Sequence, residues 1–94
     1  MSYEADRQTA QTKGYRFFVA QKTERGGRWQ HVRDDMADLH EAVVHARSLT
    51  AYDVAVFVVR TGGGYIYWSS RQPDVYNTTV ITIEIHDTED TNTA

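Results

Sequence analysis

The first segment with strand-like alternation is residues 15–23, where apolar side chains occupy every second position on one face. Phe18 lies on the opposite face of the same segment. Residues 24–27, Glu-Arg-Gly-Gly, supply glycines that accept a positive φ in a tight turn, so residues 28–33 are predicted to return as a hairpin partner. The alternating apolar side chains are Tyr15, Phe17 and Val19.

Residues 36–49 have the spacing of an amphipathic helix, the only helix that the sequence predicts. Apolar side chains recur there at three- and four-residue intervals and form one stripe. Asp34 or Asp35 is placed to cap its N-terminus, and Asp38 adds negative charge where the helix dipole favours it. The stripe consists of Met36, Leu39, Val43 and Ala46.

The strands expected after the helix are apolar on both faces. Residues 54–60, Val-Ala-Val-Phe-Val-Val-Arg, are typical of a strand that is covered from both sides. Residues 61–64, Thr-Gly-Gly-Gly, are predicted to turn the chain. Residues 65–70, Tyr-Ile-Tyr-Trp-Ser-Ser, then return as the next strand without a polar residue in their first four positions.

A fifth strand is predicted at residues 79–86, where three isoleucines occupy alternate positions. The element order is then β-β-α-β-β-β, an α+β fold in which a mostly antiparallel sheet carries one helix on one face. Residues 1–13 and the acidic residues 87–94 are predicted to be disordered tails, which leaves a single domain at residues 14–86. The lateral strand order and the face that the helix covers stay open.

The second face of the two central strands is the main functional clue. A two-residue turn at residues 62–63 would place Phe57 opposite Trp68 on one face, and a three-residue turn would exchange the partners. The other face then carries a patch of about a few hundred Å², a size that indicates an interface unless the tails or residues 71–77 cover it. This patch consists of Val54, Val56, Val58, Tyr65 and Tyr67.

Composition restricts function mainly by exclusion. The 94 residues include ten basic and thirteen acidic side chains, and this net charge of −3 disfavours general polyanion binding. The chain has no cysteine, which excludes disulfides, thiolate nucleophiles and Cys-ligated zinc. The first residues lack the apolar segment of a signal peptide, and no run is long enough to span a bilayer, so we expect a cytoplasmic protein.

No combination of residues marks a catalytic centre, and we expect a protein that is not an enzyme and has no cofactor. Asp38, Glu41 and His45 share one face of the predicted helix and would reach one metal ion, but a solvated helix face is the simpler explanation. The triple glycine lacks the Lys-Ser/Thr of a phosphate loop and precedes a strand, so a hairpin turn explains it.

Single-stranded nucleic acid is the alternative partner. Residues 13–20, Lys-Gly-Tyr-Arg-Phe-Phe-Val-Ala, partly match the strand signature of RNA-recognition proteins, but Arg16 stands where a small residue is needed and the element order differs. An aromatic sheet face with arginines beside it is suited to stacking bases. The net negative charge counts against this alternative.

The leading hypothesis is a small protein-binding module that covers a surface of another protein or of its own copy, in a homodimer. In size, acidity and lack of cysteine the chain is similar to phage and mobile-element inhibitors, anti-CRISPR proteins among them. Acidic side chains of the helix would then face a basic groove of the partner. The predicted binding residues are Phe18, Val56, Val58, Tyr65, Tyr67, Arg60, Arg71, Asp38 and Glu41.

Overall fold

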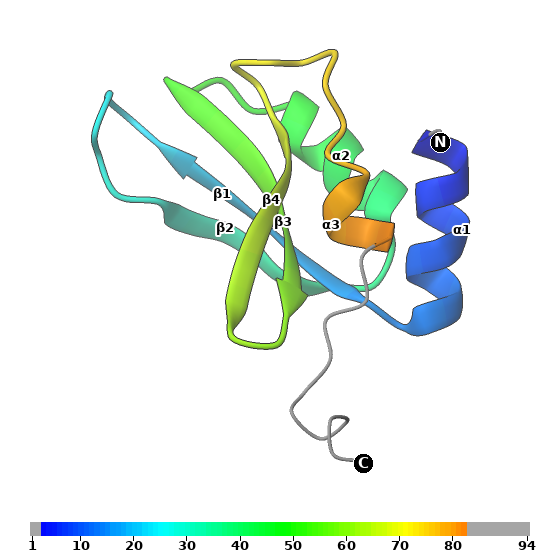
Figure 1. Cartoon of the computed structure of the whole chain (residues 1–94). Helices are drawn as coiled ribbons and strands as arrows, with labels where there is room; N and C mark the ends of the chain where they lie inside the picture. The colour runs from blue at the N-terminus through cyan, green and yellow to red at the C-terminus, as the bar shows by residue number, and fades with distance from the viewer. Residues whose placement is uncertain (1–2, 83–94) are drawn as a thin grey trace.

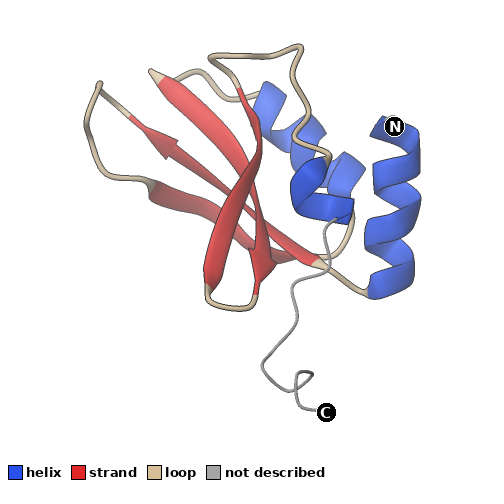
Figure 2. Ribbon diagram, viewed as in Figure 1, coloured by secondary structure: helices blue, strands red, loops and turns tan. Residues whose placement is uncertain are grey.

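The computed structural model describes residues 3–82, which form a four-stranded antiparallel sheet with three helices on one side (Figure 1, Figure 2). The lateral order is β2-β1-β3-β4. The predicted α+β class with a mostly antiparallel sheet is confirmed. The strands are β1 (Arg16–Lys22), β2 (Gln30–Met36), β3 (Asp53–Arg60) and β4 (Gly63–Ser69). The helices are α1 (Tyr3–Lys13), α2 (Leu39–Arg47) and α3 (Thr79–Thr82).

The main core lies between the sheet and the helices. Helix α2 packs on β1 and β3, α3 packs on β4, and α1 packs beside both helices. Alternate side chains of the strands meet the predicted apolar stripe of α2, because residues two apart on a strand share one face. The core side chains of β1, β3 and α2 are Phe17, Val19, Val54, Val56, Val58, Leu39, Ala42, Val43 and Ala46.

Helix α2 is the predicted helix, but it begins three residues later than expected. Met36 ends β2 and is buried there. Asp38 takes the capping role that the sequence assigned to Asp34 or Asp35: its side chain accepts a hydrogen bond from the His40 backbone N–H at 3.1 Å. A carboxylate at this position satisfies a free N–H group of the first turn and stabilises the helix.

Helix α1 occupies a segment that was predicted to be a disordered tail, and that prediction is wrong for residues 3–13. Asp6 and Ala10 are buried, and Tyr3 packs against the core. These positions recur at three- and four-residue intervals, so they share one helix face. The segment is otherwise polar, and its buried face includes a carboxylate, which conceals the pattern in the sequence.

Residues 79–82 form helix α3 instead of the start of a fifth strand. The Thr82 backbone N–H donates to the Thr78 carbonyl at 3.0 Å, and Ile81 is buried against the core. The prediction of a strand is therefore wrong for these four residues. Residues 83–86 of that predicted strand, and the predicted acidic tail at residues 87–94, lie outside the described residues. Within residues 3–82, none of the helices is long and apolar enough to cross a bilayer.

The turn between β3 and β4 lies one residue earlier than predicted. Arg60 pairs with Gly63, so the two turn residues are Thr61 and Gly62. Gly62 has a φ of +90° and Gly63 a φ of +146°, a region that side chains disfavour. This register pairs Phe57 with Ile66, so neither of the two predicted registers is correct.

A bulge in β4 explains why two consecutive residues of this strand, Tyr67 and Trp68, are both large and apolar. The register shifts between the pairs Phe57↔Ile66 and Val56↔Trp68, which leaves Tyr67 as the extra residue. Tyr67 and Trp68 are consecutive, yet both are buried in the core beneath the helices. The bulge therefore turns two neighbouring side chains toward the same face, and the two-residue alternation is lost.

Candidate functional site

The sheet face opposite the helices is the candidate binding surface, and we call it the open face. At its centre is a small apolar cluster, distinct from the main core, to which no residue of α1, α2 or α3 belongs. Outside this cluster, the open face also includes Val59 of β3 and Ile66 of β4, which are 46% and 39% exposed. The apolar residues of the open face are Phe18, Ala20, Trp29, Ala55, Phe57, Val59 and Ile66.

Aromatic rings fix the centre of the open face. The Phe18 ring stacks on His31, with centroids 4.3 Å apart, and on Phe57, with centroids 4.7 Å apart. Trp29 meets Phe57 edge-on at 5.3 Å, and the Lys22 Nζ lies 4.6 Å from the centroid of the Trp29 ring. Aromatic pairs of this kind contribute about 0.5–1.5 kcal/mol each beyond the area that they bury. These contacts therefore hold the rings of the open face in fixed positions.

Gly64 is the third glycine of the Thr-Gly-Gly-Gly sequence. The packing of aromatic rings explains why a residue without a side chain occupies this position. A Cβ added to Gly64 would lie 3.0 Å from both Cε2 and Cζ of Phe18 and 3.4 Å from Cδ2 of Phe57. The Phe18 ring thus reaches across β3 to lie against the backbone of β4. Gly62 serves the turn through its positive φ, whereas Gly64 leaves room for an aromatic ring.

Replacing Gly64 with Ala is expected to lower the free energy of unfolding by about 1–3 kcal/mol, because the Phe18 ring has to move away from its stacked neighbours. Urea denaturation measures this loss. In a Phe18→Leu background the same replacement is expected to cost less than about 0.5 kcal/mol, since leucine lacks the Cε and Cζ atoms that the new methyl group meets. Equal losses in the two backgrounds would contradict this placement of the ring.

The predicted contact face is the covered face of the sheet. Val56, Val58 and Tyr67 are buried in the main core beneath the helices. The prediction that they form a contact surface is wrong, because α2 packs on β3 and α3 packs on β4 on this face, and Tyr67 is hydrogen-bonded to Asp6 of α1. Tyr65 pairs with Val58 on the same face, nearer the β3–β4 turn than Tyr67, and remains 40% exposed. Phe18 is the predicted apolar site residue that lies on the open face.

The two predicted arginines lie over aromatic rings in different parts of the molecule. The Arg60 guanidinium carbon lies 4.5 Å from the centroid of Tyr15, and Arg60 Nη1 donates to the Val80 carbonyl at 2.8 Å. Arg60 therefore belongs to the helix side. The Arg71 guanidinium carbon lies 4.3 Å from the centroid of Tyr52, at the end of the sheet where β3 begins. The structure does not bring these two cations together.

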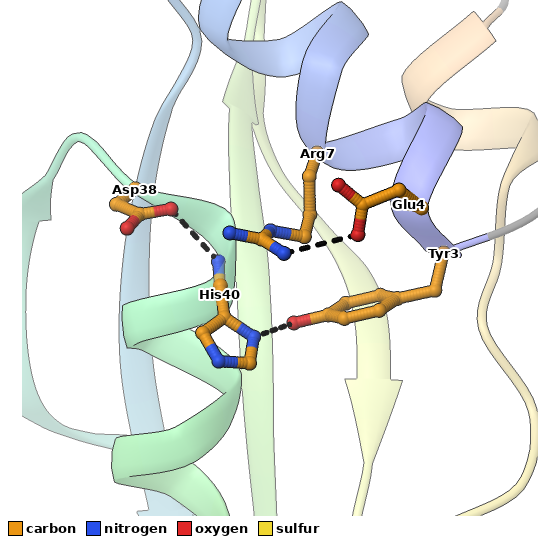
Figure 3. Close-up of polar contacts among 5 residues, drawn as sticks. All are labelled: Tyr3, Glu4, Arg7, Asp38 and His40. Atoms are coloured by element: carbon orange, nitrogen blue, oxygen red, sulfur yellow. Dashed lines mark hydrogen bonds and ion pairs between the residues drawn. The ribbon is translucent and has the colours of Figure 1, made fainter.

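Asp38 belongs to a polar contact between α1 and α2, which Figure 3 shows in close-up. The Tyr3 hydroxyl and His40 Nδ1 are hydrogen-bonded at 2.8 Å, and Arg7 pairs with Glu4 at 3.0 Å on the facing side of α1. Burial is the main cause that raises the pKa of Tyr3 to about 12. The Asp38 side chain caps α2, so the same carboxylate that was predicted to meet a partner already accepts a hydrogen bond within the fold.

The acidic helix face does not form a metal site in the described part of the chain. No group of three His, Cys, Asp or Glu residues within residues 3–82 is placed to hold a metal ion. Glu41 is exposed in the first turn of α2, and the His45 Nε2 is buried without a hydrogen-bond partner. Glu41 therefore keeps its predicted role only as a surface charge.

Several open-face residues escaped the sequence analysis, although one signal was present. Phe18 points away from its neighbours Phe17 and Val19, and it pairs directly with Phe57 across β1 and β3. Two phenylalanines on one face of a sheet are an obvious patch once the strands are known to be neighbours. Trp29 and His31 join them only because β2 lies on the other side of β1.

The chain matches no protein-family model, no curated protein and no solved structure. The chemistry of the open face is therefore the basis for assigning a function.

Proposed function

We propose that this protein is a non-enzymatic binding module that holds another protein on the open face of its sheet. One observation carries the proposal: the exposed Val59 and Ile66 and the partly exposed rings of Phe18 and Trp29 lie on one sheet face, while helices already cover the other. Aromatic side chains are enriched at protein interfaces, and contiguous apolar surfaces on small proteins commonly mark binding sites.

The dimensions of the open face bear on the predicted homodimer. Three strands have seven residues and β3 has eight, so at about 3.3 Å per residue and about 4.8 Å between strands the sheet spans a plane of about 460 Å². A stable complex buries about 800 Å² on each partner. Two copies that met only through their open faces would therefore associate weakly, and we favour a foreign protein that also contacts the rim. The homodimer stays a prediction, which light scattering over a range of concentrations would test.

The ring stacking favours protein over single-stranded nucleic acid. Base stacking requires aromatic rings with a free flat face. Phe18 already stacks on two rings, and Phe57 is only 9% exposed. The open face offers ring edges and aliphatic side chains, which fit the apolar side chains of a protein. An inhibitory role, in which the module covers a host protein as phage and mobile-element inhibitors do, extends this proposal by analogy of size and composition.

Replacing Ile66 with Glu is expected to weaken partner binding at least about tenfold, because a buried unpaired charge would face the partner. Folding should be retained, since Ile66 is 39% exposed. Val44→Glu is the matched control: Val44 is an exposed β-branched residue of α2, on the helix side. The measurement compares proteins captured by the immobilised parent and by the two variants, with unfolding midpoints recorded for each.

The proposal requires a protein that the parent and Val44→Glu retain and Ile66→Glu loses. Equal capture by both variants would contradict it and would place the contact elsewhere. An unfolding midpoint of Ile66→Glu below that of Val44→Glu would show that Ile66 supports the fold, and Val59→Glu, on the same face, would then replace it in the comparison.

A further inference from the structure

One end of the sheet gathers basic side chains beside the open face. Lys22 ends β1, and Arg25 and Arg28 lie in the turn that follows (Figure 1). Lys22 pairs with Asp53 at the start of β3, which places the end of β1 beside the start of β3. Arg71 follows β4, whose last residues also pair with the start of β3. We call these four residues, Lys22, Arg25, Arg28 and Arg71, the basic end.

The cations of the basic end have no carboxylate partner within residues 3–82. Two cations elsewhere do have one: Arg7 pairs with Glu4, and Arg16 pairs with Asp35 at 2.9 Å. Lys22 lies over Trp29, and Arg71 lies over Tyr52. Cation–π contacts orient a cation but leave its charge uncompensated. Lys22 and Arg71 therefore present positioned positive charge at the basic end.

Acidic side chains at the same end reduce its charge without cancelling it. Glu24 is exposed in the β1–β2 turn. Asp53 Oδ1 accepts hydrogen bonds from the hydroxyls of Ser69 at 2.8 Å and Ser70 at 3.3 Å, which hold its carboxylate against the chain. Asp74, which is exposed three residues after Arg71, brings a further carboxylate near this end, so four cations against three carboxylates leave a small net positive charge there, although the whole chain has a net charge of −3.

We infer that the segment bound on the open face is an acidic amphipathic segment of another protein, with its acidic residues over the basic end. This inference rests on the proposed function, because it names the chemistry of the partner that the open face holds. Apolar side chains of the segment would pack on Ile66 and on the partly buried Phe18, both of which pair with Phe57, and carboxylates would meet Lys22 and Arg28. Charge complementarity of this kind sets orientation and speeds association.

Strand geometry sets the spacing that the partner requires. Phe57 and Asp53 are four residues apart on β3, a separation of about 13 Å. Asp53 pairs with Lys22, so the same distance separates the apolar anchors from the basic end. A helical partner spans it in about two turns, and an extended partner spans it in about four residues. The carboxylates of the segment therefore lie at that distance from its apolar anchors.

Binding of three defined probes tests the inference. The first is a synthetic helical peptide with leucines at i, i+3, i+4 and i+7 and a glutamate cluster two turns further on. The second has lysines in place of the glutamates, and the third is a fifteen-nucleotide oligothymidylate. Chemical shifts of the folded chain, recorded during titration at low and high salt, give the affinity and the surface that each probe contacts.

The expected result is that the glutamate peptide binds the open face at least about tenfold more tightly than the lysine peptide, and that its affinity falls as salt rises. Arg28→Glu should reduce the affinity for the glutamate peptide about fivefold or more. Lys13→Glu, which makes the same charge change at the end of α1, should change it less than about twofold. Ile66→Glu should remove binding of both peptides.

The other outcomes separate the two proposals. If both peptides bind the open face equally, the partner is not selected for acidity, and the inference fails while the proposed function stands. If neither peptide shifts the open face at millimolar concentration, both fail. Tighter binding of oligothymidylate than of the glutamate peptide would overturn the protein partner in favour of nucleic acid.

Discussion

Tyr67→Ser is expected to lower the free energy of unfolding by about 3–5 kcal/mol, because it removes a large buried ring. The Tyr67 ring lies in the main core, and its hydroxyl donates to the Asp6 Oδ2 at 2.7 Å. Serine would leave a cavity, and its short side chain does not reach α1. Domains of this size are stable by about 5–15 kcal/mol, so thermal unfolding followed by circular dichroism should show a large drop.

Tyr65→Ser is the matched control, because it removes the same atoms two residues away. Tyr65 is 40% exposed, and we expect a change of less than about 1 kcal/mol. A Tyr67→Ser protein as stable as Tyr65→Ser would contradict the burial of Tyr67 in the main core. Retained folding with lost association would return Tyr67 to the contact surface that the sequence predicted.

Asp6→Ala is expected to lower the free energy of unfolding by about 2–4 kcal/mol. Asp6 is buried and accepts hydrogen bonds from the hydroxyls of Tyr67 and Thr78, so it joins α1 to β4 and to the start of α3. Alanine would leave the buried Tyr67 hydroxyl and the half-buried Thr78 hydroxyl without this acceptor. Burial, followed by this hydrogen bond to Asp6, raises the pKa of Tyr67 well above its ordinary value. Urea denaturation monitored by tryptophan fluorescence measures the loss.

Asp6→Asn separates the hydrogen bonds from the space that the side chain fills. An amide oxygen can accept from one hydroxyl while its N–H group donates to the other, since hydroxyl groups both donate and accept. We therefore expect Asp6→Asn to cost less than about 1 kcal/mol. Thr78→Val removes one hydroxyl at constant shape. Its loss in free energy of unfolding should lie between the losses of Asp6→Ala and Asp6→Asn. Equal stability of the Ala and Asn variants would mean that the hydrogen bonds contribute little.

Local sequence patterns predicted the parts of the fold whose stability is local. The helical stripe of α2, the turn at residues 24–27 and the alternation of β1 were readable because each depends on neighbours within a few residues. Helix α1 was missed because only Tyr3, Asp6 and Ala10 mark its buried face. The burial of Asp6 depends on Thr78, a partner 72 residues away that no local pattern can reveal.

At the candidate site, prediction from the sequence failed for a different reason. The sequence predicted that both faces of the central strands are apolar and that the helix side covers only one, and this is what the structure has. It did not show which face, because Val56 and Phe57 are adjacent and similarly apolar. The choice depends on which face of β3 helix α2 packs against, a contact between distant segments that places Val56, Val58 and Tyr67 in the core.

The contact between α1 and the start of α3 has a consequence for synthesis on the ribosome. Helix α1 emerges first, but the Thr78 hydroxyl that binds its Asp6 is added 72 residues later. At about 5–20 residues per second, that interval lasts several seconds. Both hairpins and α2 form from nearby residues, so they can be complete before the two ends of the fold meet. We therefore expect the nascent chain to build its sheet first and to close the helical side last.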